Sequence, residues 1–261
     1  MNIWHIFRVY KKFPIHVLVY FENSTYTRNA YPALRETMEI VPGIHQVDGV
    51  NGNCYLIVRH GITVIDTGLP GAGKTILSYI QGTLGRTPSD IRTIILTHYH
   101  IDHTGNVNML RSASAGKVAI HGADAPFVSG QEKPPRPGGC RGTLFAILGT
   151  FMKTQPFTPD IILNDRDVIN GMTCIHIPGH TPGSIGLLDP GTGIFFVGDT
   201  LRFDGQRIEG PPPQFTRDMA LAHESMKKIA ALDFDIMLSG HGVPLRPGAS
   251  GKVREFVTSR G

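Results

Sequence analysis

The segment Thr97–His103 constrains this chain more than any other part of its sequence. It reads Thr-His-Tyr-His-Ile-Asp-His, so three histidines and one aspartate fall within six consecutive positions. The isoleucine-rich run Ile91–Leu96 comes just before it and is typical of a short buried strand. Neutral imidazole and carboxylate groups are ligands that Zn²⁺ and similar first-row ions prefer. The segment therefore predicts a metal site at the end of a buried strand.

The spacing within the segment indicates how its side chains would be shared. In an extended chain, side chains two positions apart point to the same side, so His98 and His100 can hold one ion. Asp102 and His103 lie just beyond, where we expect the loop to turn into a helix over Thr104–Leu110. They point elsewhere and could hold a second ion. The alternative is a set of four polar residues in an exposed loop.

The composition is that of an ordinary globular protein. The 261 residues suffice for one large domain or two small ones, with 41% hydrophobic and 18% charged residues. The formal net charge of +4 could favour anionic substrates, but Lys and Arg are scattered, so no nucleic-acid partner is expected. No apolar run approaches the roughly 20 residues that span a bilayer, so no membrane segment is expected either.

The cysteines indicate a reducing environment. Cys54, Cys140 and Cys174 are odd in number and widely spaced, and no CxxC occurs. This usage favours a compartment without a disulfide framework. We therefore expect a cytoplasmic protein whose cysteines are small buried apolar side chains.

From Met38 onward, the chain shows short and regular elements. Strands and helices alternate through two similar halves, which fits two sheets sandwiched between helices and an α/β (α+β) fold. The expected helices are Gly73–Gln81, Thr104–Leu110 and Thr216–Leu232. The expected strands are Glu39–Val47 with a turn, Cys54–Val58, Thr63–Ile65, Ile91–Leu96, Val118–Ile120, Asp167–Ile169, Thr173–Ile177, Gly186–Leu188, Gly193–Val197 and Asp235–Leu238.

Two regions do not show these short and regular elements. Residues 1–37 have aromatic and basic side chains without clear periodicity, so we interpret them as an N-terminal extension to a domain that covers residues 38–261. Within residues 121–160, a segment dense in Pro and Gly precedes the apolar helical stretch Thr143–Met152. Such an insertion between metal-ligand segments would suit a lid or a pocket wall, and an ordinary packing helix is the alternative.

Three later residues repeat the design of a polar side chain at a strand end. His180, Asp199 and His241 each follow an expected strand, and a glycine directly precedes each of them. Glycine suits a sharp turn or a close approach of the backbone. One such residue would be weak evidence, because a lone His or Asp at a strand end is usually structural. Together with the first segment, they form one ordered set of metal-type residues.

This ordered set, HxHxDH followed by His, Asp and His, resembles the signature of the metallo-β-lactamase superfamily of metallohydrolases, from about Met38 to the C-terminus. The resemblance implies a four-layer αββα sandwich with a dinuclear site at one edge. It implies two divalent ions, foremost Zn²⁺, with Fe or Mn as alternatives. The first ion would be held by His98, His100 and His180. The second would be held by Asp102, His103 and His241, with Asp199 bridging the two.

Asp66 ends a further expected strand at the same edge, and the family has an aspartate here too. We expect Asp66 to accept a hydrogen bond from a ligand histidine, the alternative being a turn or a helix cap. Among the other histidines, His121 ends a short strand just before the expected lid, so a contact with substrate is its one functional interpretation.

The implied chemistry is hydrolysis of a small-molecule substrate. Two ions about 3.5–4 Å apart can share a water molecule and lower its pKa toward neutrality. The metal-bound hydroxide would attack an acyl or phosphoryl centre, and Asp102 could orient it and pass a proton to the leaving group. The resemblance thus implies cleavage of an ester, thioester or lactone, with promiscuous β-lactam or phosphodiester cleavage as a further outcome. A homodimer is left open.

Several differences between this sequence and individual branches of the superfamily narrow the choice of function. Two subclasses of class B β-lactamases place Cys at the position of Asp199, which argues against them. Val197–Leu201 looks like the glyoxalase II and lactonase-type branches, but only 20 residues follow His241, too few for the helical glutathione-binding domain of glyoxalase II. The first rival is an iron-dependent persulfide dioxygenase, which uses one metal on the same scaffold. A non-catalytic, metal-dependent structural protein is another.

A competing motif occurs at Gly68–Thr75, which matches the Walker A pattern GxxxxGK[ST] between an expected strand and helix. Nucleotide binding is the weaker interpretation, because Pro70 removes a backbone donor and Asp66 lies close to where a phosphate would sit. A glycine-rich turn that caps a helix is the simpler one.

Overall fold

The computed structural model describes residues 39–135 and 154–259. The expected N-terminal extension, residues 1–37, lies outside these ranges, and so does the expected apolar helix over 143–152. The expected lid over 121–160 is described only at its two ends. Of the three cysteines, Cys54 and Cys174 are buried and free, as expected of small apolar side chains, and Cys140 falls outside the described residues.

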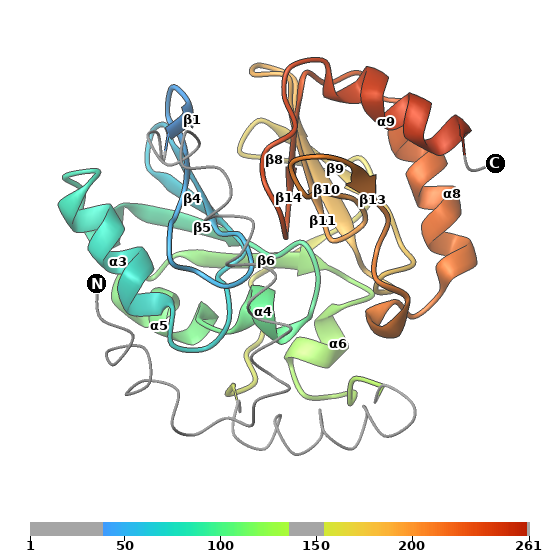
Figure 1. Cartoon of the computed structure of the whole chain (residues 1–261). Coiled ribbons are helices and arrows are strands. Elements are labelled where there is room, and N and C mark those ends of the chain that lie inside the picture. Colours follow the sequence, from blue (N-terminus) through green and yellow to red (C-terminus); the bar gives the residue numbers. More distant parts are fainter. Residues whose placement is uncertain (1–38, 136–153, 260–261) are drawn as a thin grey trace, which may run out of the picture. The chain divides into compact units, whose positions relative to one another are not determined.

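Two sheets form the body of the fold (Figure 1). The seven-stranded sheet follows chain order, with strands β1 Glu39–Val41, β2 Ile44–Gln46, β3 Tyr55–Val58, β4 Ile62–Ile65, β5 Ile91–Ile95, β6 Lys117–His121 and β7 Ile161–Leu163. The five-stranded sheet has the order β14-β11-β10-β9-β8, with strands β8 Val168–Ile169, β9 Met172–His176, β10 Ile185–Asp189, β11 Ile194–Gly198 and β14 Ile236–Ser239. A two-stranded ribbon pairs β12 Arg202–Phe203 with β13 Ile208–Glu209.

Helices cover the outer face of each sheet (Figure 1). The described α-helices are α3 Gly73–Gly82, α4 Ile101–Thr104, α5 Val107–Ser114, α6 Ala125–Val128, α8 Met219–Ala230 and α9 Ala249–Thr258. Two short 3₁₀ turns, η2 Pro88–Asp90 and η3 Pro213–Phe215, complete the described elements. No helix within residues 39–135 and 154–259 has the length and apolar character that crossing a membrane requires.

Alternation along the strands separates three apolar layers. In β3, Leu56 packs with the side chains of α3 and α5, whereas its neighbours Tyr55 and Ile57 pack against the other sheet. In β11, Phe196 faces the first sheet and Phe195 packs with α8 and α9. Successive strand residues point to opposite faces, so a strand buried on both faces reads as a continuous apolar run. These three layers give the four-layer αββα sandwich that the resemblance implied.

The parallel strands bring the polar strand ends to one edge of the sandwich. Strands β4, β5 and β6 are parallel, so the segments that follow them leave the first sheet at the same edge. Strands β11 and β14 are parallel in the second sheet. Backbone hydrogen bonds join the two sets of loops, from Ile185 N to Thr97 O (2.9 Å) and from Asn53 N to Gly240 O (2.7 Å). The candidate site therefore lies where loops of both sheets meet.

One expected helix was wrong in detail. The single helix over Thr104–Leu110 is two helices, α4 and α5, and α4 already contains Asp102 and His103. The break falls at Gly105, where a Cβ would lie 2.5 Å from Gly68 O and 2.4 Å from Pro70 N. A tight crossing with the β4–α3 loop therefore separates the two helices, and no local periodicity reports such a contact.

The start of another helix differs from its predicted position for a local reason. The helix expected from Thr216 begins at Met219, because Asp218 adopts an extended conformation and its side chain accepts a hydrogen bond from Leu221 N (2.9 Å). Strand β7, the β12–β13 ribbon and helix α9 were not predicted. The ribbon strands have two residues each, which is too short for a detectable alternation.

Candidate metal centre

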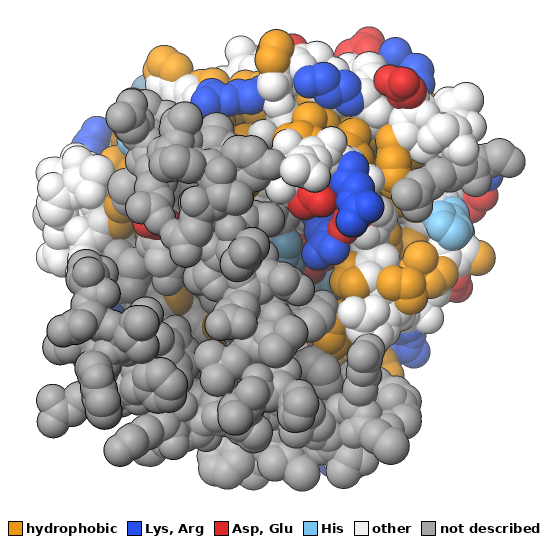
Figure 2. All heavy atoms as spheres, in the orientation of Figure 1, with side chains coloured by type: hydrophobic (Ala, Val, Ile, Leu, Met, Phe, Trp, Pro, Cys, Tyr) orange, Lys and Arg blue, Asp and Glu red, His pale blue; other side chains and the backbone are white. Residues whose placement is uncertain are grey.

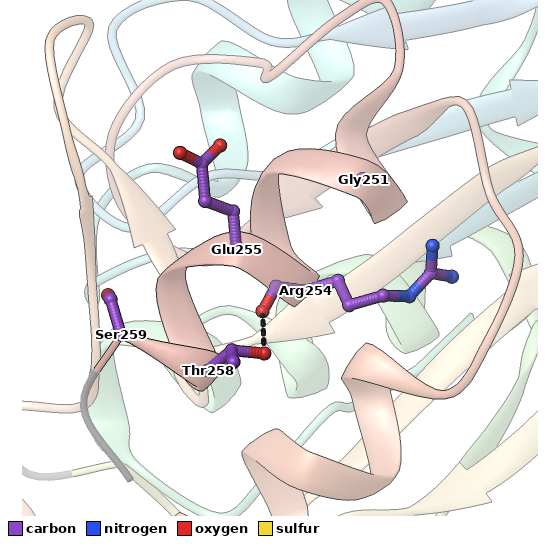
Figure 3. Close-up of a pocket in the computed structure, with 5 residues that line it drawn as sticks. All are labelled: Gly251, Arg254, Glu255, Thr258 and Ser259. Atoms are coloured by element: carbon purple, nitrogen blue, oxygen red, sulfur yellow. Dashed lines mark hydrogen bonds between the residues drawn. The ribbon is translucent and has the colours of Figure 1, made fainter.

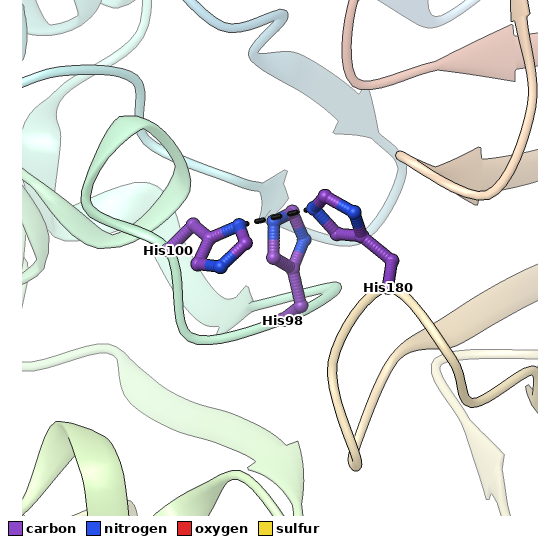
Figure 4. A group of neighbouring side chains, drawn as sticks. All are labelled: His98, His100 and His180. Carbon is purple, nitrogen blue, oxygen red and sulfur yellow. Dashed lines mark hydrogen bonds between the residues drawn. The ribbon is translucent and has the colours of Figure 1, made fainter. Parts of the chain in front are cut away.

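Seven side chains from four segments meet at the shared edge of the two sheets. Their potential ligand atoms form three overlapping sets of three residues each. Within each set, all the ligand atoms lie within 4.8 Å of one another. The sets are His98, His100 and His180; His98, His103 and Asp199; and Asp102, His103 and His241. Figure 4 shows the rings of the first set pointing toward one another from two separate loops. The structure thus brings together all seven residues that the sequence singled out, while their role as metal ligands remains a prediction.

Asp199 lies between the two sets that were expected to hold separate ions. Its Oδ2 atom is 3.5 Å from His180 Nε2 and 3.4 Å from His241 Nε2. Its Oδ1 atom is 3.5 Å from His103 Nε2. One carboxylate therefore faces nitrogen atoms of both sets, which is the geometry that a bridging ligand needs.

Hydroxyl groups orient two of the histidines. Thr97 Oγ1 donates its only hydrogen to Asp66 Oδ2 (2.7 Å). Thr97 Oγ1 is therefore the acceptor in its hydrogen bond with His98 Nδ1 (3.0 Å). Thr216 Oγ1 donates to Pro212 O (2.9 Å), so it accepts from His180 Nδ1 (3.2 Å). Both rings therefore carry their proton on Nδ1 and present an unprotonated Nε2 to the cluster.

The three-histidine set is neutral at pH 7. Burial, with the nearby His103 and His100, holds the pKa of His98 well below its usual range. Burial and the neighbouring His180 lower the pKa of His100 to about 3, and burial also lowers the pKa of His180. Metal binding requires neutral imidazole, so burial keeps these rings in the form that binds a cation.

The set of Asp102, His103 and His241 has the opposite electrostatic balance. Burial opposes a charge on His103, but Asp199, Asp66 and Asp102 outweigh it and raise the pKa of His103 well above its usual range. Burial also opposes a charge on His241, yet Asp199 and a hydrogen bond to Asp102 raise the pKa of His241 to about 10. Three carboxylates around this set thus create a negative potential that favours a cation.

Unpartnered atoms test whether a cation fits. Among the described residues, His98 Nε2, His103 Nε2 and Asp199 Oδ1 are buried and have no hydrogen-bond partner. Buried polar atoms are normally paired, so two imidazole nitrogens and a carboxylate oxygen gathered without partners call for a common electropositive partner, which would displace the proton from His103 Nε2. The space beside them is kept by Gly240, where a Cβ would lie 2.1 Å from Asp199 Oδ1 and 2.6 Å from His103 Cε1. The residues therefore fit divalent metal ions with nitrogen and oxygen ligands.

The side chains of the cluster differ in exposure among the described residues. Those of His98, His103 and His180 are at most 1% exposed, whereas those of Asp102 and His241 are 29% and 30% exposed. His100 is also partly exposed. Asp102 Oδ2 and His241 Nε2 are 3.1 Å apart, so these two partly exposed side chains lie next to each other.

Asp66 accepts the hydrogen bond that was expected from a ligand histidine. His103 Nδ1 lies 2.8 Å from Asp66 Oδ2, and Asp66 also accepts from Thr97 N (2.8 Å) and Thr97 Oγ1 (2.7 Å). Its φ of 56° lies in the left-handed region, which aspartate tolerates better than most residues. The carboxylate fixes the His103 proton on Nδ1 and leaves Nε2 free for a metal.

Asp66→Asn should weaken metal binding at the set of Asp102, His103 and His241 by roughly 10–100-fold. An amide nitrogen facing His103 Nδ1 would donate to it, which moves the ring proton to Nε2 and removes the lone pair. Chelator competition with Zn²⁺ measures this, and Asp189→Asn, a buried carboxylate at the far end of β10, is the control. Two ions bound with parental affinity would contradict this role of Asp66.

The Walker-like loop is held by a side chain of the protein itself. Asn106 Oδ1 accepts from Gly71 N (3.0 Å) and Gly73 N (2.9 Å). Asn106 Nδ2 donates to three carbonyls of the same loop, those of Thr67, Gly68 and Leu69. Two of the amides that a phosphate would need are thus occupied, in agreement with the interpretation of this motif as a turn that begins helix α3.

Two cavities within the described residues carry no comparable chemistry. The larger, about 500 Å³, runs along helix α9 between Gly251 and Ser259 (Figure 3). Its lining includes a hydrogen bond from Thr258 Oγ1 to Arg254 O (2.8 Å) and no histidine or cysteine. A smaller cavity of about 250 Å³ lies beside the loop that contains His180. On the described surface in Figure 2, basic side chains lie beside acidic ones and form no continuous stripe.

His121 stacks on His176 and does not join the metal cluster. The two rings are 4.0 Å apart and nearly parallel, at 11°. Burial and the neighbouring His176 lower the pKa of His121 to about 4, although Asp165 and Asp167 act in the opposite direction. The pair joins the end of β6 to the end of β9, so it links the two sheets.

His121→Phe should flatten the pH dependence of stability between pH 6.5 and about 4. In this window the unfolded chain protonates His121 and the folded chain does not, so the free energy of unfolding falls as the pH falls. Phenylalanine keeps a ring against His176 but cannot titrate. Urea unfolding at several pH values measures the slope, with the exposed His223→Phe as control. Parallel slopes for His121→Phe and the parent would contradict the assignment.

Sequence patterns missed the residues that orient the ligands. Thr97, Thr216 and Asp124 make hydrogen bonds to the ligand segments, and Asn106 holds the loop next to Asp66. Only Thr97 is adjacent to a ligand in the sequence and could have been singled out. The others act across 25 or more residues, so no local pattern reports them.

The comparisons with known proteins agree with this geometry. Residues 47–241 match the family model of the metallo-beta-lactamase superfamily. The chain is 29% identical over 229 residues to the probable metallo-hydrolase YflN of Bacillus subtilis, which covers 79% of this chain and 86% of that protein. It is 25% identical over 229 residues to the hydroxyacylglutathione hydrolase GloC of Haemophilus influenzae, covering 85% of this chain and 99% of that protein.

Solved structures show the same fold. The chain superposes on the crystal structure of TTHA1623 in a di-iron-bound form with a TM-score of 0.62 and 27% identity, over 82% of this chain and 98% of that one. The family model spans most of the chain and includes every residue of the cluster from His98 to His241. This protein is therefore a metal-binding hydrolase of the metallo-β-lactamase superfamily.

Proposed function

We propose that this chain hydrolyses an ester, thioester or lactone at a centre of two divalent metal ions. The observation that carries the proposal is the position of Asp199, whose two oxygens face His180, His241 and His103 at 3.4–3.5 Å. This carboxylate stands between two complete three-residue sets. An arrangement for a single ion would not need a second complete set beside the first.

The side chains would divide the work as follows. His98, His100 and His180 would hold one ion, Asp102, His103 and His241 the other, and Asp199 both. When bound, such ions act as Lewis acids and lower the pKa of water toward neutrality. The Asp102 side chain is 29% exposed, so its carboxylate can accept a hydrogen bond from the attacking water and carry a proton to the leaving group. Water thus adds to the acyl carbon, and the bond from that carbon to the leaving oxygen or sulfur breaks.

The substrate class is supported by a relative and by the residue at position 199. The hydrolase GloC, which matches over nearly its whole length, is named for a hydroxyacylglutathione, an acyl group joined to a thiol sulfur. Aspartate at position 199, in place of the Cys of two β-lactamase subclasses, favours general ester-type hydrolysis. Zn²⁺ is our first choice of ion, and the di-iron form of one structural relative keeps iron as an alternative.

A substrate panel on metal-reconstituted protein tests the proposal. The panel should contain a lactone, an acyl thioester, a β-lactam and a phosphodiester, with bound metal counted by elemental analysis in parallel. We expect two ions per chain and the fastest turnover on the thioester or lactone. His98→Ala, which removes a ligand of the three-histidine set, is expected to lower both metal content and turnover.

Two outcomes would overturn the proposal. One iron per chain, with oxygen consumption on a persulfide and no hydrolysis, would favour the dioxygenase. Fully metal-loaded protein that cleaves none of the activated esters would indicate a structural role for the metals.

A further inference from the structure

The buried carboxylate of Asp124 connects the two loops that carry the three-histidine set. Asp124 lies between β6 and α6 and is fully buried. Its Oδ2 atom accepts from Tyr99 N (2.9 Å), the residue between His98 and His100. The same oxygen accepts from Thr181 Oγ1 (2.7 Å), the residue after His180.

The second oxygen of Asp124 completes the link. Asp124 Oδ1 accepts from Gly183 N (2.6 Å), which lies in the loop between β9 and β10. A Cβ at Gly183 would lie 2.7 Å from the Asp124 carboxyl group, so the loop packs directly on the carboxylate. Tyr99 follows a strand of the first sheet, while Thr181 and Gly183 follow a strand of the second, so one carboxylate spans both sheets.

The two loops must stay in register for their histidines to meet. His100 Nδ1 and His180 Nε2 are only 3.0 Å apart, although they come from different sheets. Apart from Asp124, the backbone bond from Ile185 N to Thr97 O (2.9 Å) also joins these segments, at the base of the loops. Asp124 makes its contacts next to the ligands themselves, where a small shift changes the ligand geometry most.

We propose that Asp124 is a positioning residue that holds His98, His100 and His180 in one metal-binding geometry. The proposal rests on the two-metal centre proposed above, but it concerns only the three-histidine set and does not depend on the substrate. Asp124 touches none of the metal-facing atoms, so it acts through Tyr99 N, Thr181 Oγ1 and Gly183 N.

Asp124→Asn tests this role, because an amide replaces one acceptor by a donor that faces another donor. Co²⁺ affinity should be measured in two backgrounds, each of which removes one ligand from one of the two sets expected to hold separate ions. Of these two sets, only the three-histidine set is complete in His241→Ala protein, and there Asp124→Asn should weaken Co²⁺ binding roughly 10–100-fold. Only the set of Asp102, His103 and His241 is complete in His100→Ala protein, and there Asp124→Asn should leave the affinity unchanged.

Matched variants separate positioning from general loss of stability. Thr181→Val removes the hydroxyl that donates to Asp124 and should reproduce the loss in the His241→Ala background, whereas Thr181→Ser keeps the hydroxyl and should preserve the affinity. Asp189 is also buried and accepts from Gly191 N and Thr192 Oγ1, so Asp189→Asn controls for the loss of a buried carboxylate. Thermal unfolding of every variant shows which ones remain folded.

The outcomes are distinct. Unchanged Co²⁺ affinity of Asp124→Asn in the His241→Ala background, or equal losses in both backgrounds, would overturn the positioning role while leaving the metal centre intact. If His241→Ala and His100→Ala proteins both bind no Co²⁺ although the parent does, the two sets are not separate sites. The proposal that Asp124 positions one of them is then contradicted. If the parent protein itself binds no Co²⁺, both the proposed metal centre and the proposed role of Asp124 are contradicted.

Discussion

Asp199→Ala should lower kcat/KM for hydrolysis by at least about 1000-fold. Asp199 is the one residue of the cluster whose two oxygens face nitrogen atoms of both expected metal sets. Alanine removes both oxygens and leaves His103 and His241 without the carboxylate that balances a charge beside them. The same substitution should therefore reduce the bound metal below two ions per chain.

Steady-state kinetics and elemental analysis on the same preparation measure both effects. The control is Asp233→Ala, because the Asp233 side chain is 96% exposed and lies on the surface beside Arg254. Near-parental turnover, or two ions retained in Asp199→Ala, would contradict the bridging position of this carboxylate.

Asn106→Ala should reduce the free energy of unfolding by at least about 3 kcal/mol. The Asn106 side chain is buried, accepts from Gly71 N and Gly73 N, and donates to the carbonyls of Thr67, Gly68 and Leu69. Truncation leaves several of these backbone groups without a partner, and each buried unsatisfied group costs about 1–3 kcal/mol. The expected loss is a large part of the total stability of a typical domain.

Urea unfolding of the metal-free protein measures the loss without a contribution from bound ions. Asn108→Ala is the matched control, because Asn108 lies two residues further along, in helix α5, and its hydrogen bond to Gln155 O is exposed. We expect Asn108→Ala to cost less than about 1 kcal/mol. Equal losses for the two variants would show that the buried hydrogen bonds of Asn106 stabilise the fold no more than the exposed one of Asn108.

Much of the fold could be predicted because its signals are local. The continuous apolar runs of β3 and β11 reflect burial on both faces of the sheets, and burial acts on each residue according to its position in the strand. The glycines before the later ligands were also informative. Gly179 and Gly198 have φ values of 131° and 51°, and Gly240 allows the close approach of Asp199.

The ends of elements were predicted less well. The helix after His103 divides at Gly105, where the β4–α3 loop crosses it, and that loop lies far from Gly105 along the chain. The start of α8 was missed for a local reason, because the cap at Asp218 places the first helical residue at Met219. Helix α9, which was not predicted, packs on α8, and Val253 and Met226 belong to one buried apolar cluster.

The sequence by itself determined which residue types could bind metal, since imidazole and carboxylate groups at strand ends have a chemistry that does not depend on their neighbours. It also determined the αββα layers, because strands buried on both faces need apolar side chains at every position. The tertiary structure decided how the ligands are oriented. Asp66 fixes the proton of His103, and Asp124 joins loops of two sheets through hydrogen bonds that span 25 to 59 residues. Such bonds form only when the sheets pack together, so no pattern along the chain encodes them.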